Sequence, residues 1–294
     1  MTQVFDLPSF QEHRVPRSGG DVYVRDFPGQ GPAFVLLHGF PDNARIYDPV
    51  IPHLVAGGRR VVTLDFLGFG ASDKPEGGGY SFPQQLGDVE AVIDALRLDK
   101  VVTVGHDAGG PAAVNYALRN PDRTAAVTLI NAFYGEAPGL RVPELIALFS
   151  TATLSALQRH FLQSPAEFGW LIDFQRVLMA RDLTPDQKAR YESFLGPLIN
   201  ENFTQRPSAA PAFAAMTSQI HDEIAANTAR LVEFRRSAVP LLLIWGALDP
   251  YLHVSMAEHL RSQARTAALH VVQAGHWPQV DEPSEVARIM LEQR

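Results

Sequence analysis

Short apolar runs alternate with helical patterns along most of this chain of 294 residues. Apolar residues recur at three- and four-residue spacing from Leu86 to Leu96 and again from Val286 to Met290, which is typical of helices with one buried face. Strands that are apolar throughout and separated by helices predict a mostly parallel sheet with helices on both faces. The apolar runs that predict strands lie at about 21–27, 33–38, 60–66, 101–106, 125–131, 240–246 and 268–273.

The alternation stops between about residues 134 and 236, where apolar residues recur almost entirely at helical spacing. A strand-like run that begins at Val239 then resumes the sheet, so the helical segment is inserted between two strands of the core. The sequence therefore predicts an α/β core with a doubly wound sheet, formed by residues 1–133 and 237–294, and a helical cap formed by residues 134–236.

Composition excludes several classes of protein. Hydrophobic residues make up 46% of the chain and charged residues 19%, as in an ordinary globular protein. Lys and Arg number 25 against 32 Asp and Glu, and the resulting net charge of -7 argues against binding to nucleic acid, which needs a clustered basic face. No cysteine is present, so disulfides, thiolate metal sites and thiol nucleophiles are excluded.

Neither a signal peptide nor a membrane span is expected. Residues 1–10 include Asp6 and Pro8 and lack a basic start followed by an apolar stretch. The longest apolar run, residues 239–248, contains Pro240 and is far shorter than the roughly 18 residues that a membrane span needs. We therefore expect a cytoplasmic protein that does not bind membranes, and the sequence leaves homodimerisation open.

The sharpest local feature is the segment 101–110, in which a predicted strand ends in the pattern Gly-His-Asp-Ala-Gly and a helical pattern follows. A strained turn between strand and helix exposes its central side chain, and glycine on both sides allows the backbones to approach closely. Such a turn carries a serine nucleophile in many hydrolases, whereas its centre here is Asp107. The alternative interpretation of Asp107 is a helix N-cap.

Further motifs follow in an order that fits a nucleophile at this turn. Residues 34–41 form a predicted strand that runs into a glycine turn, the place where an oxyanion-hole amide is expected. Asp249 lies just past the predicted strand 240–246, and His276 follows Asp249 by 27 residues. The order of candidate nucleophile, acid and base along the chain is therefore Asp107, Asp249 and His276.

Together these motifs resemble those of α/β-hydrolase-fold enzymes, over nearly all of the chain outside the cap. Within that fold, the His-Asp pair at the turn resembles the branch with an aspartate nucleophile, which comprises epoxide hydrolases and the haloalkane and haloacid dehalogenases. The resemblance implies a hydrolase with a catalytic triad of Asp107, Asp249 and His276. Backbone amides of Phe40 and Ala108 would then form the oxyanion hole.

An aspartate nucleophile has a chemical rationale. Aspartate is already ionised at neutral pH, so unlike serine it needs no base to activate it. Its attack on an acyl carbon would give a reactive anhydride, whereas attack on a saturated carbon gives an alkyl ester. We therefore expect a substrate with an electrophilic sp3 carbon and an ester on Asp107. In this scheme His276 deprotonates the water that hydrolyses the ester, and Asp249 holds the imidazole.

Alternatives exist for the acid and the base. Asp249 lies in a Leu-Asp-Pro sequence that is also a natural turn. Some relatives place the acid after the preceding strand, where this chain offers Asn131 and, nearby, Glu136, and we favour Asp249 over both. The alternative interpretation of His276 is a histidine in a turn after a strand.

The residues beside the nucleophile bear on the leaving group. Haloalkane dehalogenases usually have a tryptophan directly after the nucleophile and often an asparagine after His-Gly, but this chain has Ala108 and Phe40, whose side chains donate no hydrogen bond. Haloacid dehalogenases place arginines at the positions of Ala108 and Pro111. Phenylalanine after His-Gly is typical of epoxide hydrolases, so an epoxide hydrolase is favoured and a haloalkane or haloacid dehalogenase is the alternative.

An epoxide leaves as a tethered alkoxide and needs a proton donor. Epoxide hydrolases usually supply two tyrosines, or a histidine and a tyrosine, from the cap. His160 is a candidate because its neighbourhood resembles that of the first donor, and Tyr134 and Tyr191 are the others. The region expected to hold the second donor, residues 214–219, contains no tyrosine. His160 and Tyr191 also fit ordinary positions on the faces of helices.

No cofactor or metal is implied. No glycine-rich dinucleotide fingerprint follows the first strand, and the ten histidines are dispersed without a metal-binding motif. We expect a small, largely apolar substrate. The remaining alternatives are a serine-type esterase, against which Asp107 argues, and a non-catalytic ligand-binding protein on a hydrolase scaffold, because a fold does not determine function.

Overall fold

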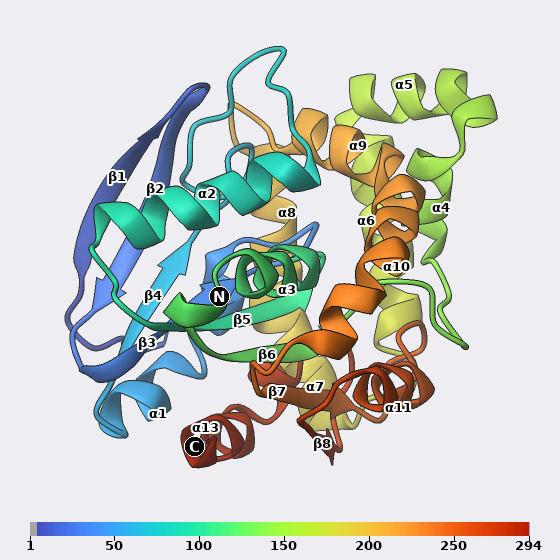
Figure 1. Ribbon diagram of the computed structural model, residues 1–294. Coiled ribbons are helices and arrows are strands. Elements are labelled where there is room, and N and C mark those ends of the chain that lie inside the picture. Colours follow the sequence, from blue (N-terminus) through green and yellow to red (C-terminus); the bar gives the residue numbers. More distant parts are fainter. Residues whose placement is uncertain (1–4, 294) are drawn as a thin grey trace.

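The computed structural model describes residues 5–293, and an eight-stranded sheet lies at its centre (Figure 1). The strand order is β1-β2-β4-β3-β5-β6-β7-β8. The β1–β2 and β2–β4 pairs are antiparallel, and every other pair is parallel, so the sheet is mostly parallel. The strands are β1 (Gln11–Arg17), β2 (Gly20–Phe27), β3 (Gln30–Leu37), β4 (Arg59–Leu64), β5 (Val101–Asp107), β6 (Thr124–Ala132), β7 (Leu241–Gly246) and β8 (Ala267–Val272).

The strands from β2 to β8 confirm the seven runs predicted from sequence, to within three residues at each end. The sequence pattern did not indicate β1. Its residues, Gln11–Arg17, are mostly polar and exposed, because β1 is the edge strand and pairs with β2 alone. An edge strand that buries few side chains carries little of the apolar signal on which strand prediction depends.

Helices cover the sheet on both faces. On one face α3 packs on β5 and β6 and lies beside α2, and elsewhere α1 packs on β4 next to α13. Their apolar faces join the side chains of the central strands in a single buried core. The helical elements of the core are η1 (Ala44–Tyr47), α1 (Ile51–Ala56), α2 (Phe82–Ala95), α3 (Gly110–Arg119), η2 (Pro121–Arg123), α11 (Val254–Gln263), α12 (Pro278–Asp281) and α13 (Pro283–Glu292).

Between β6 and β7 every regular element is helical, and we call residues 134–236 the helical insertion. Its helices form a group beside the sheet, coloured from green to orange in Figure 1. The elements of the insertion are α4 (Glu144–Ser150), η3 (Ala152–Leu154), α5 (Ser155–Gln163), α6 (Pro165–Met179), α7 (Pro185–Arg190), η4 (Tyr191–Leu195), α8 (Gly196–Thr204), α9 (Ala210–Ser218) and α10 (Ile220–Arg236).

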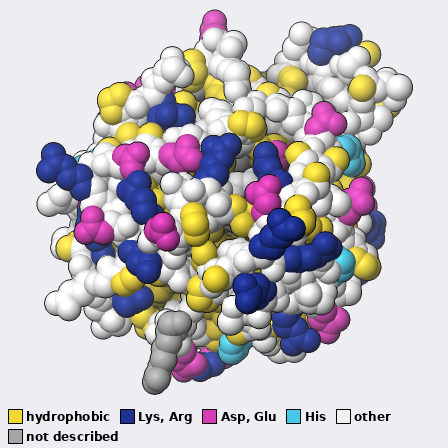
Figure 2. Space-filling model, in the orientation of Figure 1, with side chains coloured by type: hydrophobic (Ala, Val, Ile, Leu, Met, Phe, Trp, Pro, Cys, Tyr) yellow, Lys and Arg dark blue, Asp and Glu magenta, His cyan; other side chains and the backbone are white. Residues whose placement is uncertain are grey.

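The surface of the protein is mixed in charge. Basic and acidic side chains are interspersed on the face shown in Figure 2, as expected for a chain with similar numbers of both. None of the helices within residues 5–293 is sufficiently long and apolar to span a bilayer.

Candidate active site

Asp107 lies at the end of β5, at the sharp turn into α3. Its backbone has a φ of 48°, in the left-handed region that is unfavourable for residues other than glycine. The two flanking glycines make the turn possible, because a Cβ on Gly105 would lie 2.7 Å from the carbonyl oxygen of Gly109, and a Cβ on Gly109 would lie 2.5 Å from that of Leu37. The Gly-His-Asp-Ala-Gly sequence therefore places the Asp107 carboxylate at the carboxyl edge of the sheet.

The Asp107 carboxylate is held by backbone amides on one side. Its Oδ2 accepts a hydrogen bond from the amide of Phe40 at 3.1 Å, and the amide of Ala108 also binds the carboxylate. Gly39 allows this approach, because a Cβ at that position would lie only 2.4 Å from Oδ2. The two amides that the sequence assigned to an oxyanion hole thus bind the carboxylate of Asp107 itself.

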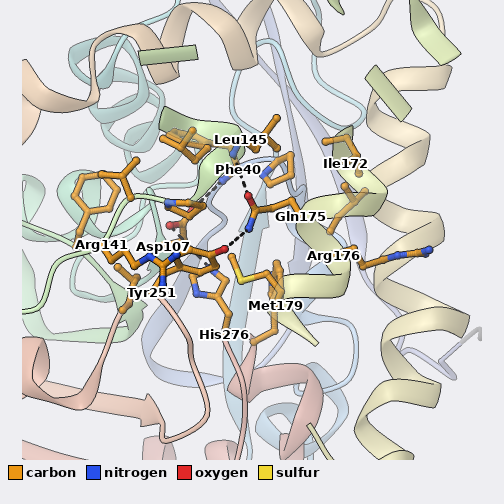
Figure 3. Close-up of a pocket in the computed structure, with 18 of the residues that line it drawn as sticks. Phe40, Asp107, Arg141, Leu145, Ile172, Gln175, Arg176, Met179, Tyr251 and His276 are labelled. Atoms are coloured by element: carbon orange, nitrogen blue, oxygen red, sulfur yellow. Dashed lines mark hydrogen bonds and ion pairs between the residues drawn. The ribbon is translucent and has the colours of Figure 1, made fainter. Parts of the chain in front are cut away.

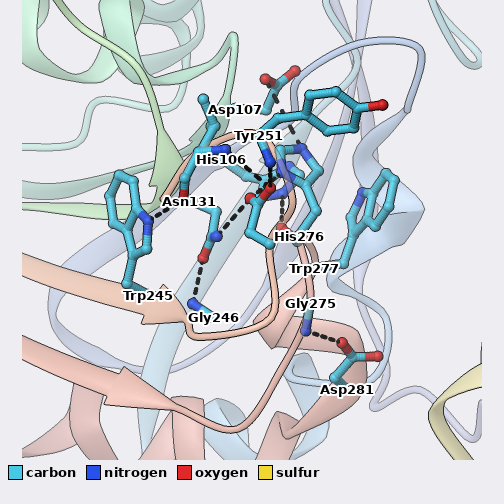
Figure 4. Close-up of polar contacts among 12 residues, drawn as sticks. His106, Asp107, Asn131, Trp245, Gly246, Tyr251, Gly275, His276, Trp277 and Asp281 are labelled. Atoms are coloured by element: carbon cyan, nitrogen blue, oxygen red, sulfur yellow. Dashed lines mark hydrogen bonds and ion pairs between the residues drawn. The ribbon is translucent and has the colours of Figure 1, made fainter. Parts of the chain in front are cut away.

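The other carboxylate oxygen faces His276. The distance from Asp107 Oδ1 to His276 Nε2 is 3.9 Å (Figure 4). On the other side of the ring, His276 Nδ1 is 2.7 Å from Asp249 Oδ2. His276 and Asp249 are both buried, and Asp107 is nearly so. The structure therefore brings together Asp107, Asp249 and His276, which stand up to 169 residues apart in the sequence.

Asp249 receives more hydrogen bonds than its partner histidine alone supplies. Its Oδ1 accepts from the amides of Tyr251 at 2.9 Å and Leu252 at 3.0 Å. Its Oδ2 accepts from Asn131 Nδ2 at 2.7 Å, and the Asn131 Oδ1 in turn accepts from the amide of Gly246 at 2.7 Å. Asn131, which the sequence offered as an alternative place for the acid, is here a donor to the acid.

The electrostatics of these groups follow from burial and mutual charge. Burial disfavours a charged His276, but the carboxylates of Asp249, Asp107 and Asp42 outweigh it and raise the pKa of His276 to about 9. Burial likewise disfavours a charged Asp249, yet His276 and the backbone amides lower its pKa overall. Burial raises the pKa of Asp107, against the opposing effects of His276 and the two amides.

A second layer of polar contacts supports His276 from behind. His106 Nε2 lies 2.8 Å from the carbonyl oxygen of His276, and the Trp277 indole donates to Asp42 Oδ2 at 2.9 Å. The Gly275 amide donates to Asp281 at 2.7 Å. Burial raises the pKa of Asp42 to about 7, because only the Trp277 indole and the charge of His276 offset the loss of solvent. The loop that carries His276 is thus fixed by hydrogen bonds on both sides.

A largely apolar cavity opens in front of Asp107 and His276 (Figure 3). The helical insertion supplies much of its wall, through residues of α4, α6, η4, α8 and α10. The polar side chains that line it besides Asp107 and His276 are Arg141, Gln175, Arg176, Tyr191 and Tyr251. The apolar side chains that line it include Phe40, Phe133, Leu145, Ile146, Ile172, Met179, Ile199, Ile220, Ile224 and Trp277.

The three residues that the sequence named as proton donors lie in different surroundings. Tyr191 lines the cavity, and its ring meets that of Trp277 edge-on at 5.4 Å. The side chain of His160 is 58% exposed, pairs with Glu167 and does not line the cavity. Tyr134 is buried elsewhere, where its hydroxyl donates to Asn115 at 3.0 Å. Only Tyr191 of the three therefore shares a cavity with Asp107.

Sequence reasoning did not single out Tyr251 or Gln175, which also line the cavity. Tyr251 stands two residues after Asp249, so its place next to the candidate acid was a visible signal. Gln175 gave no such signal, because one polar residue on an otherwise apolar helix has no distinctive spacing. Among residues 5–293, no three histidine, aspartate or glutamate side chains are grouped as a metal site would require.

Comparison with known proteins adds to this geometry. Residues 32–283 match the family model described as alpha/beta hydrolase fold. The chain is 28% identical to "Bifunctional epoxide hydrolase 2" of Sus scrofa, covering 90% of this chain and 51% of that protein. It is 27% identical to a "Haloalkane dehalogenase" of Mycobacterium marinum, covering 88% and 86%. The solved haloalkane dehalogenase DbeA of Bradyrhizobium elkani superposes with a TM-score of 0.76 at 22% identity, covering 96% and 97%, which shows a common fold.

Proposed function

This chain belongs to the alpha/beta hydrolase fold family, and from that premise we propose that it is an epoxide hydrolase that works through an alkyl ester on Asp107. Hydrolases with this fold include relatives named epoxide hydrolase and haloalkane dehalogenase. The proposal concerns the mechanism and the substrate. We also propose that the helical insertion, residues 134–236, serves as the cap that closes the cavity over Asp107.

The observation that carries the proposal is the occupant of the oxyanion hole. The amide of Phe40 binds Oδ2 of Asp107, and the amide of Ala108 binds the same carboxylate. In a serine hydrolase such amides bind the carbonyl oxygen of the substrate. Here that place is filled by the enzyme's own carboxylate, so the oxyanion that these amides stabilise would form on Asp107. This arrangement fits an ester of Asp107 as the species that water hydrolyses.

The first step is attack on carbon by the free carboxylate oxygen. Asp107 lines the cavity, and its Oδ1 lies 3.9 Å from His276 Nε2, while Oδ2 remains held by the Phe40 amide. Attack on a saturated carbon forms a carbon–oxygen bond and breaks the bond from that carbon to the epoxide oxygen. The electron pair of the broken bond stays on the oxygen, which then takes a proton. Tyr191 lines the cavity and is the cap donor that we propose for this proton.

The second step is hydrolysis of the ester with His276 as the base. With a pKa of about 9, His276 is protonated in the resting enzyme at neutral pH. The negative charge of Asp107 is one cause of that raised pKa, and esterification removes this charge. The pKa of His276 therefore falls after the first step, and the imidazole releases its proton to solvent. It then accepts a proton from the water that attacks the ester carbonyl. The bond from the carbonyl carbon to the substrate oxygen breaks, and that oxygen takes the proton back from His276, which releases a diol. The new carboxylic acid of Asp107 gives its proton to His276, so the carboxylate and the protonated imidazole are restored, and the Tyr191 phenolate takes a proton from solvent.

Few donors in the cavity suit a halide. The side chains of Ala108 and Phe40 beside Asp107 donate no hydrogen bond. The Trp277 indole, which lies at the cavity, already donates to Asp42. Arg141 and Arg176 line the cavity but pair with Glu144 at 2.9 Å and Asp173 at 3.1 Å. A dehalogenase remains the second candidate, because a relative of similar identity bears that name.

The proposal is tested by trapping the ester. A His276→Gln variant should still form the ester on Asp107 but hydrolyse it slowly, because it lacks the base. Incubation with styrene oxide should raise the mass of the peptide that contains Asp107 by the mass of one epoxide. The matched control is the His276→Gln/Asp107→Asn double variant, which should show no increase. Absence of any adduct in His276→Gln, or an adduct at another residue, would overturn the mechanism, and an adduct from bromoalkanes alone would favour the dehalogenase.

A further inference from the structure

We propose that Tyr251 is a second proton donor to the epoxide oxygen, supplied by the core and not by the helical insertion. This inference rests on the proposed function, because it assigns a residue to the opening of the epoxide. Tyr251 lines the same cavity as Asp107, His276 and Tyr191. Within residues 5–293, it and Tyr191 are the two tyrosines that do so.

The position of Tyr251 is tied to the candidate triad through its backbone. It lies in the loop that follows β7, and its amide donates to Asp249 Oδ1 at 2.9 Å. The same loop therefore orients the acid and presents the tyrosine side chain to the cavity. Trp245, at the end of β7, fixes the far side of the loop by donating to the carbonyl oxygen of Leu252 at 2.6 Å.

Two contacts of Tyr251 favour loss of its proton, against burial and the Glu144 carboxylate, which raise the pKa of Tyr251 to about 12 in the resting enzyme. Gln175 Nε2 donates to the Tyr251 hydroxyl oxygen at 2.8 Å (Figure 3). The orientation of the Gln175 side-chain amide is fixed, because its Oε1 accepts from the Leu145 backbone amide at 3.0 Å. The Arg141 guanidinium lies 5.1 Å from the centre of the Tyr251 ring. A fixed N–H donor and a nearby cation both favour the phenolate that forms when the proton leaves.

Glu144 links the Tyr251 hydroxyl to solvent. In the resting structure the hydroxyl donates to Glu144 Oε2, while Arg141 binds Oε1 of the same carboxylate at 2.9 Å. The Glu144 side chain is 39% exposed, whereas Tyr251 is buried. Tyr251 therefore connects the cavity to the Glu144 carboxylate, which is partly exposed and can exchange protons with water.

The proton account balances with these groups. When the epoxide carbon–oxygen bond breaks, the oxygen holds the electron pair as an alkoxide, which is a much stronger base than a phenolate. The Tyr251 hydroxyl turns from Glu144 to the alkoxide, so that both Tyr251 and Tyr191 donate hydrogen bonds to the same oxygen. The oxygen takes one proton, and when that proton comes from Tyr251 an alcohol forms and a phenolate remains beside Gln175 and Arg141. A proton from solvent then returns to the phenolate through Glu144.

The test separates formation of the ester from its hydrolysis. In the His276→Gln background, where the ester accumulates, Tyr251→Phe should slow formation of the styrene oxide adduct by at least about 10-fold, because a positioned acid contributes about 100-fold to 10,000-fold and Tyr191 remains as the other donor. In an enzyme with His276 intact, Tyr251→Phe should leave the rate of ester hydrolysis unchanged. A merely structural role would alter both rates, since the loop also holds Asp249.

A second variant tests whether Gln175 acts through Tyr251. Gln175→Met should slow adduct formation in the presence of Tyr251 and add little when residue 251 is Phe, since contacting residues that act together are not additive. Val177→Ala is the control on the same helix, because Val177 is 67% exposed and does not line the cavity. Equal adduct rates with and without Tyr251→Phe would overturn this inference alone. No adduct in His276→Gln itself would instead overturn the proposed function.

Discussion

At the scale of single residues, the site depends on how one carboxylate is divided between two environments. Oδ2 of Asp107 is bound by the amide of Phe40, and Oδ1 faces the imidazole of His276. Gly39, Gly105 and Gly109 are required for this division, because a side chain at any of them would collide with Asp107 or with backbone. In the proposed mechanism, this geometry selects Oδ1 as the reactive oxygen before a substrate binds.

The charge of His276 makes stability depend on pH. Its pKa in the folded protein is about 9, above the ordinary value of 6.5, so it contributes stability that is fully present below pH 6.5 and is lost as pH rises through 9. The difference in free energy of unfolding between the wild type and His276→Gln should therefore shrink as the pH is raised from 6 to 9.5. Urea unfolding of both proteins at several pH values measures this difference. A difference that stays constant or grows with pH would contradict the assigned charge.

At the scale of elements, Asn131 of β6 is hydrogen-bonded both to the end of β7 and to Asp249. It ends the regular part of β6 with a φ of 36°, and its amide group bridges the Gly246 amide at the end of β7 to Asp249. The carboxyl ends of parallel strands meet at one edge of the sheet, so a single buried amide can fix the loop after β7 from the strand next to it. The position of Asp249 is therefore set by contacts between elements as well as by its own turn.

Removing this bridge should weaken both the fold and the reaction. Asn131→Gly keeps the positive φ accessible but leaves the buried Gly246 amide without a partner, which should lower the free energy of unfolding by about 1–3 kcal/mol. Turnover should also fall, because Asp249 loses a donor that holds its carboxylate. Chemical denaturation and steady-state kinetics measure the two effects. The control is Asn120→Gly, on a surface turn, and wild-type stability in Asn131→Gly would show that the bridge is unimportant.

At the scale of the whole molecule, hydrogen bonds join the helical insertion to the core close to the candidate active site. Asn202 of α8 is buried and donates to the carbonyl oxygen of Pro41 at 2.8 Å, and its side-chain oxygen accepts from Asn43 at 3.2 Å and from the Gly70 amide at 3.3 Å. Pro41 directly follows Phe40, whose amide binds Asp107. The contact that holds the insertion therefore also holds the loop whose Phe40 amide binds Asp107.

An Asn202→Ala substitution should loosen this junction. Loss of three hydrogen bonds, one of them buried and two partly buried, should lower the free energy of unfolding by about 1–3 kcal/mol, and turnover should fall because the Phe40 loop is less well fixed. Hydrogen exchange should rise in α8 and the Pro41 loop while β5 and β6 remain protected. Asn200→Ala, on the same helix, is the control. Unchanged exchange in α8 would mean that apolar packing alone holds the insertion.

The sequence by itself determined the architecture and the identity of the candidate triad. Apolar strand runs and helical spacing depend on neighbouring residues, so the seven strands from β2 to β8 could be predicted, and the strained turn at Asp107 has a recognisable glycine pattern. The polar edge strand β1 escaped detection because it buries too little to leave an apolar pattern.

Only the tertiary structure decided which other side chains line the cavity next to Asp107. His160, Tyr134 and Tyr191 were equivalent candidates in sequence, and packing alone placed Tyr191 in the cavity and the other two outside it. Gln175 and Tyr251 meet across 76 positions of sequence. No local pattern records such a contact, because it is created by the way in which the helical insertion packs on the loop after β7.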